Sequence, residues 1–250
     1  MKKTALITGA SSGIGLAYAK YLAKKDWNLD LVSNEEERLD PYKKDLNYNK
    51  ANYFLYDLSK SESIENLCND IDVPDLIVAN AGIAVNGRIG TLSHAEKNNA
   101  YYLMCGGVID MLEKLIPKMI EKGGGRIVII SSIGAVSAMP KSSIYSSIKS
   151  AIYAYGKSIN AELKNENISV TVSLPGYVKT NAHERAGLSH LKKKVPSWMW
   201  VSADQVVKET ENASIKGKSE IIPGIVYKIT KPFLRFNTAI LIWKRITKKR

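Results

Sequence analysis

Short apolar runs alternate with stretches of helical spacing along most of the chain. The strand-like runs lie at residues 4–8, 28–33, 51–56, 75–79, 125–131 and 168–174. The helical stretches lie between them, at residues 15–25, 35–45, 61–70, about 96–121 and 144–164. One more helix and a short strand are expected at residues 203–215 and 220–222. This alternation predicts an α/β fold, in which a parallel sheet carries helices on both faces.

Two of the predicted strands are apolar without interruption. They are Leu76–Ala79 and Ile127–Ile130. Strands have this uniform composition when helices cover both faces of a sheet, because neither face then meets water. With the short strand near residue 220, the sheet would contain about seven strands in one doubly wound domain.

Length and composition fit a single domain of this kind. The chain has 250 residues, and no linker, repeat or low-complexity tract divides it. We expect the α/β domain to cover residues 1–225 and a basic amphipathic tail to cover residues 226–250. Cys68 and Cys105 lie in apolar helical stretches without metal-ligand spacing, so we predict buried thiols and no metal site. Reduced thiols, an N-terminus that starts the fold and apolar runs too short for a span predict a cytoplasmic protein.

A glycine-rich turn joins the first predicted strand to the first helix. Its glycines are Gly9, Gly13 and Gly15. Gly9 would allow the tight turn, Gly13 would let the backbone approach a pyrophosphate, and Gly15 would let helix and strand pack closely. A helix that begins here offers free N–H groups and the positive end of its dipole to a phosphate. The position of the turn therefore predicts a dinucleotide site in a Rossmann-type fold.

A second group of residues has the composition of a proton-transfer site. Tyr145 and Lys149 are four residues apart, which puts the phenol and the ammonium on one face of a helix. A neighbouring cation lowers the pKa of a phenol from its usual value of about 10, and the phenol can then exchange a proton with a substrate oxygen. Ser132, at the end of a predicted strand, could donate a hydrogen bond to the same oxygen. Taken alone, the Tyr–Lys spacing is more typical of an incidental pair on a solvated helix.

The segment from Thr8 to Gly15, with its Gly-x3-Gly-x-Gly spacing, resembles the nucleotide-binding turn of the short-chain dehydrogenase/reductase family. Further motifs of that family follow in the same order, over about residues 4–180. Asp57-Leu58 resembles the motif that contacts adenine, and Asn80-Ala81-Gly82 resembles the motif after the fourth strand. The remaining matches are the catalytic residues Ser132, Tyr145 and Lys149 and the segment Pro175-Gly176-Tyr177-Val178-Lys179-Thr180 beside the nicotinamide.

The resemblance implies a set of cofactor-binding residues. They are Gly9, Ser11, Ser12, Gly13, Ile14, Gly15, Ser33, Asn34, Asp57, Leu58, Asn80, Ala81, Gly82, Tyr145, Lys149, Pro175, Gly176, Val178 and Thr180. It also implies that Lys149 binds the nicotinamide ribose as well as lowering the pKa of Tyr145. The predicted strands are followed by Gly9 to Gly15, Asp57, Asn80, Ser132 and Pro175, and the carboxyl ends of parallel strands meet in one crevice.

Each motif also has a purely structural interpretation. Ser132 could be an ordinary turn residue, and Asp57 could cap a helix ahead of Ser59. Asn80 could stabilise a turn with its side chain, and Pro175-Gly176 could be a loop breaker. The ordered set favours the functional interpretation over these alternatives.

The chain departs from the family pattern at one position. Many members carry a catalytic Asn in the helix after the fourth strand, where it relays protons from the Lys through water. Counting from the motifs on either side places that position at Met104. Asn98 and Asn99 lie about one and a half turns earlier and would need a shift of register to replace it. Either another polar group serves the relay, or turnover is slow.

The choice between NAD and NADP is made just after the second predicted strand. A carboxylate there accepts a hydrogen bond from the ribose 2′-hydroxyl, whereas a basic side chain accommodates a 2′-phosphate. The chain has Ser33 and Asn34 at these positions, and Ser12 at a third position that is basic in some NADP-dependent members. Arg38 could reach a phosphate that Ser33 and Asn34 bind, whereas Glu35 would repel it. We therefore expect NADP, with NAD as the alternative.

Two C-terminal segments bear on the substrate and on partners. Residues 181–200 match the mobile lid of the family, and the aromatic residues of Trp198-Met199-Trp200 could form an apolar substrate wall or pack on the core. Beyond Glu220 the chain has no acidic residue and eight basic ones, out of a formal net charge of +12. This tail could pack within the molecule or against another subunit, or lie on the inner membrane surface. No motif points to nucleic acid, so we expect no such partner.

Together these features predict an NAD(P)-dependent oxidoreductase that interconverts a small-molecule carbonyl and the alcohol by hydride transfer. Tyr145 would be the general acid or base. The resemblance implies a homodimer or homotetramer that assembles through the long helices. The alternative is a cofactor-binding regulatory or scaffold protein with little catalysis, which Met104 favours and the complete set of Ser132, Tyr145 and Lys149 disfavours.

Overall fold

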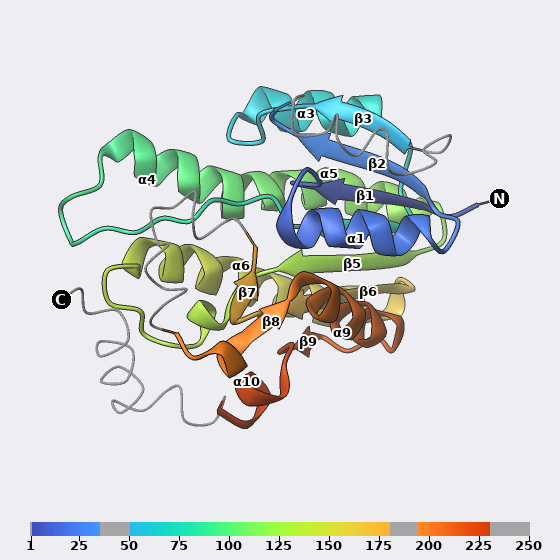
Figure 1. Ribbon diagram of the computed structural model, residues 1–250. Coiled ribbons are helices and arrows are strands. Elements are labelled where there is room, and N and C mark those ends of the chain that lie inside the picture. Colours follow the sequence, from blue (N-terminus) through green and yellow to red (C-terminus); the bar gives the residue numbers. More distant parts are fainter. Residues whose placement is uncertain (1, 36–50, 181–194, 231–250) are drawn as a thin grey trace.

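The computed structural model describes residues 2–35, 51–180 and 195–230, which form a parallel sheet between two layers of helices (Figure 1). The sheet has seven strands in the order β3-β2-β1-β4-β5-β6-β9. Their bounds are β1 Thr4–Thr8, β2 Asn28–Ser33, β3 Ala51–Leu55, β4 Leu76–Ala79, β5 Gly125–Ile130, β6 Ile168–Ser173 and β9 Glu220–Ile221. This confirms the α/β fold with a Rossmann-type sheet of seven parallel strands.

Within the described ranges, the helices match the predicted ones, except that the long helix predicted at 96–121 is divided in two and the short helix that starts at residue 225 was not predicted. They are α1 Gly13–Ala23, α3 Ser61–Asp70, α4 His94–Tyr101, α5 Gly107–Glu121, α6 Ser143–Glu162, α9 Ala203–Ile215 and α10 Ile225–Thr230. Short 3-10 turns lie at Ile133–Ala135, Leu163–Asn165 and Ser197–Met199. The helix predicted at 35–45 lies outside the described residues, except for Glu35. Among the described helices, none is both long and apolar enough to cross a membrane.

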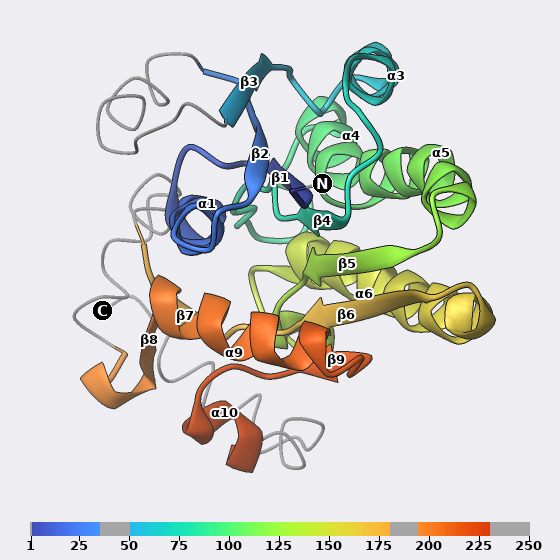
Figure 2. The ribbon, with the colours of Figure 1, turned by 90° about the vertical axis from the view of Figure 1, so that its right-hand side faces the viewer.

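Two hydrophobic cores fill the space between the sheet and its helices. Helices α1 and α9 cover one face, and α4, α5 and α6 cover the other (Figure 2). Neighbouring residues of one strand point to opposite cores, as Ile127 and Val128 of β5 do. Burial on both sides is the reason that β4 and β5 are uniformly apolar.

The long helix predicted at 96–121 is interrupted by a π-helical turn at Tyr102–Gly106. The two glycines at the end of this turn, Gly106 and Gly107, have no side chain, and the ring of Tyr102 packs against both of them. A Cβ on Gly106 would lie 3.1 Å from the ring of Tyr102. A helical periodicity in the sequence does not reveal such a π turn.

A small second sheet was not predicted. Strands β7 (Tyr177–Lys179) and β8 (Trp200–Ser202) pair in parallel, with Tyr177 opposite Trp200. The two rings are 5.3 Å apart between centroids. This sheet fixes the chain that leaves β6 beside the carboxyl ends of the main strands.

Candidate functional site

A cavity of about 590 Å³ lies at the carboxyl ends of the central strands. Its volume is within the range of about 300–1,000 Å³ that is usual for small-molecule sites. The strand order reverses between β1 and β4, and the loops after these two strands diverge there to leave a crevice. All the site residues predicted from the sequence line this cavity except Gly15. The structure therefore brings together residues that are scattered over the sequence from Gly9 to Thr180.

The glycine-rich turn has the backbone that only glycine adopts readily. Gly9 and Gly13 have φ angles of +64° and +58°. Gly15 lies behind the cavity wall, where a Cβ would overlap the carbonyl oxygen of Gly9 and crowd the side chain of Asn80. Gly15 thus lets the helix pack against the turn itself, rather than against the strand as predicted. Helix α1 begins at Gly13 with no acidic residue in its first turn, so its N-terminus suits an anion.

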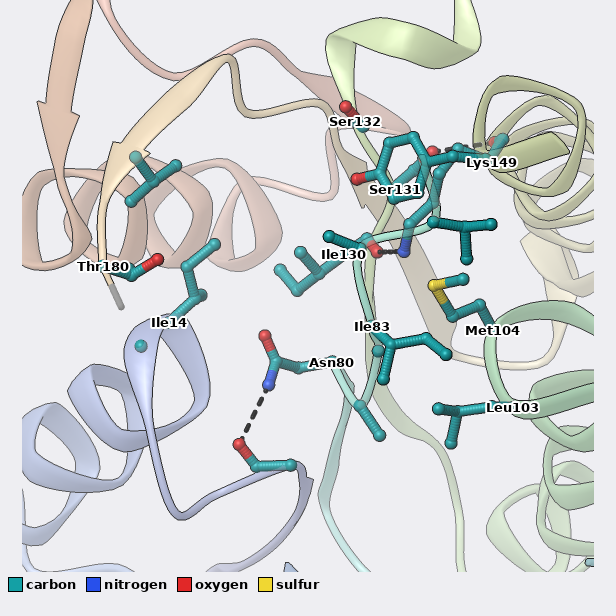
Figure 3. Close-up of a pocket in the computed structure, with 18 of the residues that line it drawn as sticks. Ile14, Asn80, Ile83, Leu103, Met104, Ile130, Ser131, Ser132, Lys149 and Thr180 are labelled. Atoms are coloured by element: carbon teal, nitrogen blue, oxygen red, sulfur yellow. Dashed lines mark hydrogen bonds between the residues drawn. The ribbon is translucent and has the colours of Figure 1, made fainter. Parts of the chain in front are cut away.

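Asn80 and Thr8 tie the loop after β4 to this turn. The amide of Asn80 donates to the carbonyl oxygens of Thr8 and Gly9, at 3.0 and 3.2 Å. The Thr8 hydroxyl oxygen accepts from the backbone N–H groups of Asn80 and Ala81, at 2.9 and 3.0 Å. The structural role considered for Asn80 is therefore real, and it stabilises a wall of the cavity (Figure 3).

The end of the cavity near β2 and β3 is polar. It is lined by Ser33, Asn34, Glu35 and Asp57, among others. The Ser33 hydroxyl oxygen accepts from the backbone N–H of Glu35 at 3.3 Å, which shapes the turn after β2. One Asp57 carboxylate oxygen accepts from the backbone N–H of Ser59 at 3.0 Å. Asp57 is not a helix cap, because the N-cap residue of α3 is Lys60.

Ser132, Tyr145 and Lys149 face the other end of the cavity. Lys149 is only 5% exposed, and its ammonium donates to the carbonyl oxygen of Ile130 at 2.9 Å (Figure 3). The same nitrogen lies 5.9 Å from the centroid of the Tyr145 ring. The Ser132 hydroxyl oxygen accepts from the backbone N–H of Gly134 at 3.1 Å, at the start of the 3-10 turn.

The electrostatics of this group differ from the sequence expectation. Burial raises the pKa of Tyr145, and its hydrogen bond with Ser132 lowers that pKa in part. The sequence analysis expected Lys149 to lower the pKa of Tyr145. In this arrangement it does not, and its ammonium donates to the carbonyl oxygen of Ile130 instead. Burial lowers the pKa of Lys149 to about 8. At neutral pH the site thus holds a protonated phenol beside a buried ammonium.

Met104 occupies the wall of the cavity and is 2% exposed. Its sulfur lies against Gly82, where a Cβ would be 3.2 Å away. Asn98 does not take its place, because the Asn98 side chain is exposed and pairs with His94 at 2.8 Å. Asn99 is also exposed. Neither Asn98 nor Asn99 therefore takes the position of the relay Asn.

The sequence analysis missed a second set of lining residues. They belong to the loops after β4 and β5 and include Ile83, Ala84, Val85, Asn86, Met139, Pro140, Lys141 and Ser142. Their only sequence signal is their position next to the motif residues, since their types vary from apolar to basic. Among the described residues, no group of His, Cys, Asp and Glu side chains could hold a metal ion.

Only the end of the predicted lid, residues 195–200, lies within the described residues. The indole N–H of Trp200 donates to the carbonyl oxygen of Val195 at 3.2 Å, and its ring packs on Tyr177. Trp198 is 64% exposed. Neither Trp is among the described residues that line the cavity, so for Trp200 packing on the core is the interpretation that fits.

The family model for short chain dehydrogenases matches residues 3–189. The chain belongs to the short-chain dehydrogenase family. This confirms the resemblance seen in the motifs, and with it membership of a family of oxidoreductases. The matched range contains every site residue named from the sequence.

Curated relatives of this short-chain dehydrogenase differ in length. The chain is 32% identical over 188 residues to "Dehydrogenase/reductase SDR family member 7B" of Xenopus tropicalis. The aligned residues cover 70% of this chain and 61% of that protein. The chain thus spans about three fifths of that relative. It is 29% identical over 239 residues to "3-oxoacyl-[acyl-carrier-protein] reductase FabG" of Buchnera aphidicola, which covers 90% of this chain and 98% of that protein.

Solved structures share the fold over almost the whole chain. A short-chain dehydrogenase from Sphingobium yanoikuyae in complex with NADPH has a TM-score of 0.82 at 23% identity, covering 99% of this chain and 98% of that one. A 4-hydroxyisoleucine dehydrogenase complexed with NADH has a TM-score of 0.80 at 24% identity, covering 89% and 97%. At these identities the likeness concerns the fold.

Proposed function

We propose that this dehydrogenase is an NADP-dependent enzyme that interconverts a carbonyl group and a secondary alcohol. The observation that carries the proposal is the single cavity that joins the glycine-rich turn to Tyr145. One end offers a helix N-terminus to phosphates, and the other end offers a phenol, a hydroxyl and an ammonium to a reacting oxygen. A bound nicotinamide dinucleotide would supply or accept the hydride.

The cavity wall fits such a dinucleotide. The turn from Gly9 to Gly13 would hold the pyrophosphate, because its backbone can approach the phosphates where no side chain intervenes. Both glycines have a positive φ, which would strain the backbone of a residue with a side chain. Asp57 would bind at the adenine end, and the segment from Pro175 to Thr180 at the nicotinamide end. Relatives of the same fold have been solved with NADPH and with NADH, which supports a nicotinamide cofactor in general.

The preference for NADP rests on the polar end of the cavity. The residue at the end of β2 is Ser33 and not an acidic residue, so the carboxylate that would repel a 2′-phosphate is missing from that position. Asn34 follows it and lines the cavity, and its amide can donate to a phosphate oxygen. Glu35 lines the same end and opposes this preference.

Tyr145 would donate the proton to the carbonyl oxygen during reduction. Its phenol, with an ordinary pKa of about 10 that burial raises further, is protonated at neutral pH, which is the form that a general acid requires. Ser132 would donate a hydrogen bond to the same oxygen and hold it in line. Lys149 would hold the cofactor ribose, as the family resemblance implies.

Two measurements test this function. Calorimetric titration with NADP and NAD gives the preferred cofactor, and a panel of carbonyl compounds is then followed at the absorbance of the reduced nicotinamide. Replacing Tyr145 with Phe should remove nearly all turnover while cofactor binding survives, because only the acidic hydroxyl is lost. Turnover that persists in this variant would defeat the assignment.

A cofactor-binding regulatory protein is the second candidate, because Met104 occupies the wall where many relatives carry a polar relay residue. This candidate requires tight cofactor binding with no turnover on the whole panel. The complete set of Ser132, Tyr145 and Lys149 at one end of the cavity favours the enzyme.

A further inference from the structure

A second, smaller hollow adjoins the catalytic end of the main cavity. Its volume is about 140 Å³. The two share Val85, Lys141 and Ser142 as lining residues. A volume of this size would hold roughly five waters at about 30 Å³ each, whereas complete small-molecule ligands occupy about 300–1,000 Å³. The hollow therefore suits one chemical group of a ligand whose remainder lies in the main cavity.

The walls of the hollow carry three cations from three separate segments. They are Arg88 in the loop after β4, Lys97 on α4 and Lys141 in the loop before α6. Within the described part of the chain, none of the three makes an ion pair. No acidic residue is among the described residues that line the hollow.

The acidic residue next to Lys97 in the sequence does not neutralise this charge. Glu96 is the third residue of a capping box, and its carboxylate accepts from the backbone N–H of Ser93 at 2.8 Å. Hydrogen bonds with the side chain and the backbone N–H of Ser93 lower the pKa of Glu96 and commit its carboxylate to the start of α4. The hollow is thus a positively charged recess, with the hydroxyl of Ser143 as a further donor.

Hydrogen bonds between the two loops give the hollow a fixed shape. The backbone N–H of Gly87 donates to the carbonyl oxygen of Lys141 at 2.8 Å. The Ser142 hydroxyl donates to the side-chain oxygen of Asn86 at 3.3 Å. Lys141 has a φ angle of +66°, which is uncommon for a residue other than glycine and is often found at functional sites.

We propose that this hollow binds an anionic group of the substrate, a carboxylate or a phosphate, while the carbonyl of the same molecule lies at Tyr145. The inference rests on the proposed function, since it deepens the description of that site. Three cations and the hydroxyl of Ser143 suit an oxyanion, because charge-assisted hydrogen bonds to such a group are the strong ones. Val85, Met139 and Pro140 are apolar residues of the main cavity's lining, and Val85 also lines the hollow, so an aliphatic spacer between the two groups would meet apolar surface.

The test compares charged and neutral forms of one substrate. Aliphatic keto acids of increasing chain length, their methyl esters and keto-alkyl phosphates of matching length are assayed with the preferred cofactor. The acid or the phosphate should have the lower KM at one chain length, and the ratio between these two identifies the oxyanion. The double variant Arg88→Gln, Lys97→Gln should raise the KM for the charged compound about tenfold and leave the KM for the ester within about twofold.

Two further variants control for folding and for net charge. Lys141→Asn removes a shared cation without backbone strain, because Asn tolerates a positive φ, and it should raise the same KM about threefold. Lys208→Gln, on the exposed side of α9, changes the net charge equally and should change neither KM. Equal KM values for acid, phosphate and ester, or an oxyanion preference that survives the double variant, would overturn the inference.

A binding measurement, which needs no turnover, tests the oxyanion site independently of the proposed function. The keto acid and the keto phosphate are titrated calorimetrically into the protein with its cofactor, in the wild type and in the double variant. Affinity that falls about tenfold in the double variant supports the oxyanion site even where no compound of the panel turns over. Binding of equal strength in both proteins, or no binding to the wild type, refutes it.

Discussion

Lys149 is a buried cation whose ammonium donates to one backbone carbonyl, that of Ile130. Removal of a charge from water is costly, so burial lowers the pKa of this amine to about 8. The group is thus close to losing its charge at mildly alkaline pH. The buried ammonium is thus held at a cost in stability, and the dependence of stability on pH can measure that cost.

The stability of the protein should therefore respond to the titration of Lys149. An unfolded chain has this amine at the ordinary pKa of 10.5, while the folded chain has it at about 8. Between these values the unfolded chain binds more protons, so the free energy of unfolding rises with pH. Relative to Lys149→Met, the wild type should gain about 2 kcal/mol between about pH 7 and about pH 10. Urea unfolding at several pH values measures the difference, and a constant difference would contradict the buried charge.

Gly15 is the glycine of the turn that has the least room for a side chain. A Cβ there would overlap the carbonyl oxygen of Gly9 and crowd Asn80. Gly15→Ala should cost about 2 kcal/mol in the free energy of unfolding and weaken cofactor binding, because the turn must shift. Gly217→Asn is the matched control, since Gly217 has open space and a φ of +63° that Asn tolerates. Normal cofactor affinity in Gly15→Ala would show that the turn is more adaptable than its packing implies.

One buried carboxylate links helix α9 to the sheet and to helix α1. Glu211 accepts from the guanidinium of Arg126 on β5 at 2.8 Å and from the hydroxyl of Tyr18 on α1 at 3.1 Å. Arg126 also donates to Ser214 at 2.9 Å. These bonds join α1, β5 and α9 on the face of the sheet away from α5.

Removal of that carboxylate should be strongly destabilising. Glu211→Ala leaves the guanidinium of Arg126 without its buried partner, and the free energy of unfolding should fall by about 3 kcal/mol. Lys208→Ala, one turn earlier on the exposed side of α9, should change it by less than about 0.5 kcal/mol. Both are read from denaturant midpoints. Similar midpoints for the two variants would mean that apolar packing alone holds α9.

The π-helical turn directs Met104 and Cys105 into the interior together. If a polar side chain here carries protons from Lys149, Met104→Asn should raise turnover about threefold or more, since it restores the residue common in the family. It should also lower the free energy of unfolding by about 1–3 kcal/mol, because the amide is buried with few partners. Met104→Leu keeps the apolar volume and should leave turnover unchanged. Equal turnover in both variants would show that proton relay does not limit this protein.

At the scale of elements, prediction from the sequence succeeds where the pattern has one physical cause. Strands β4 and β5 were predicted because burial on both faces requires apolar residues throughout. The π turn was missed, because the apolar spacing of residues 96–121 continues on both sides of it. Strands β7 and β8 were missed because three residues are too few to show a period, and their pairing depends on contacts across the sequence.

At the scale of the whole molecule, the candidate site could be predicted because parallel strands end at one edge. Motifs far apart in the sequence meet there whatever the details of the loops. The direction of the Lys149 ammonium and the set of loop residues from Ile83 to Ser142 could not be predicted, because they depend on local hydrogen bonds. The hollow near Lys141 depends on the same loops and is equally invisible in the sequence.

The net charge of +12 should affect how strongly the protein binds its cofactor. NADP carries one phosphate more than NAD, so it is attracted more strongly to a positively charged protein, and salt screens that attraction. Between about 50 mM and about 500 mM salt, the Kd for NADP should rise about fivefold more than the Kd for NAD. Calorimetry at several salt concentrations gives both slopes. Equal slopes would indicate that the 2′-phosphate site lies outside the positive field.

The bonds between Thr8, Asn80 and Gly9 have a thermodynamic consequence for ligand capture. A loop that is already locked gives up little conformational freedom when a nucleotide arrives. Association then resembles the docking of two rigid bodies. The heat-capacity change of binding reflects the apolar surface that the nucleotide and the cavity wall bury against each other, rather than the folding of a disordered segment.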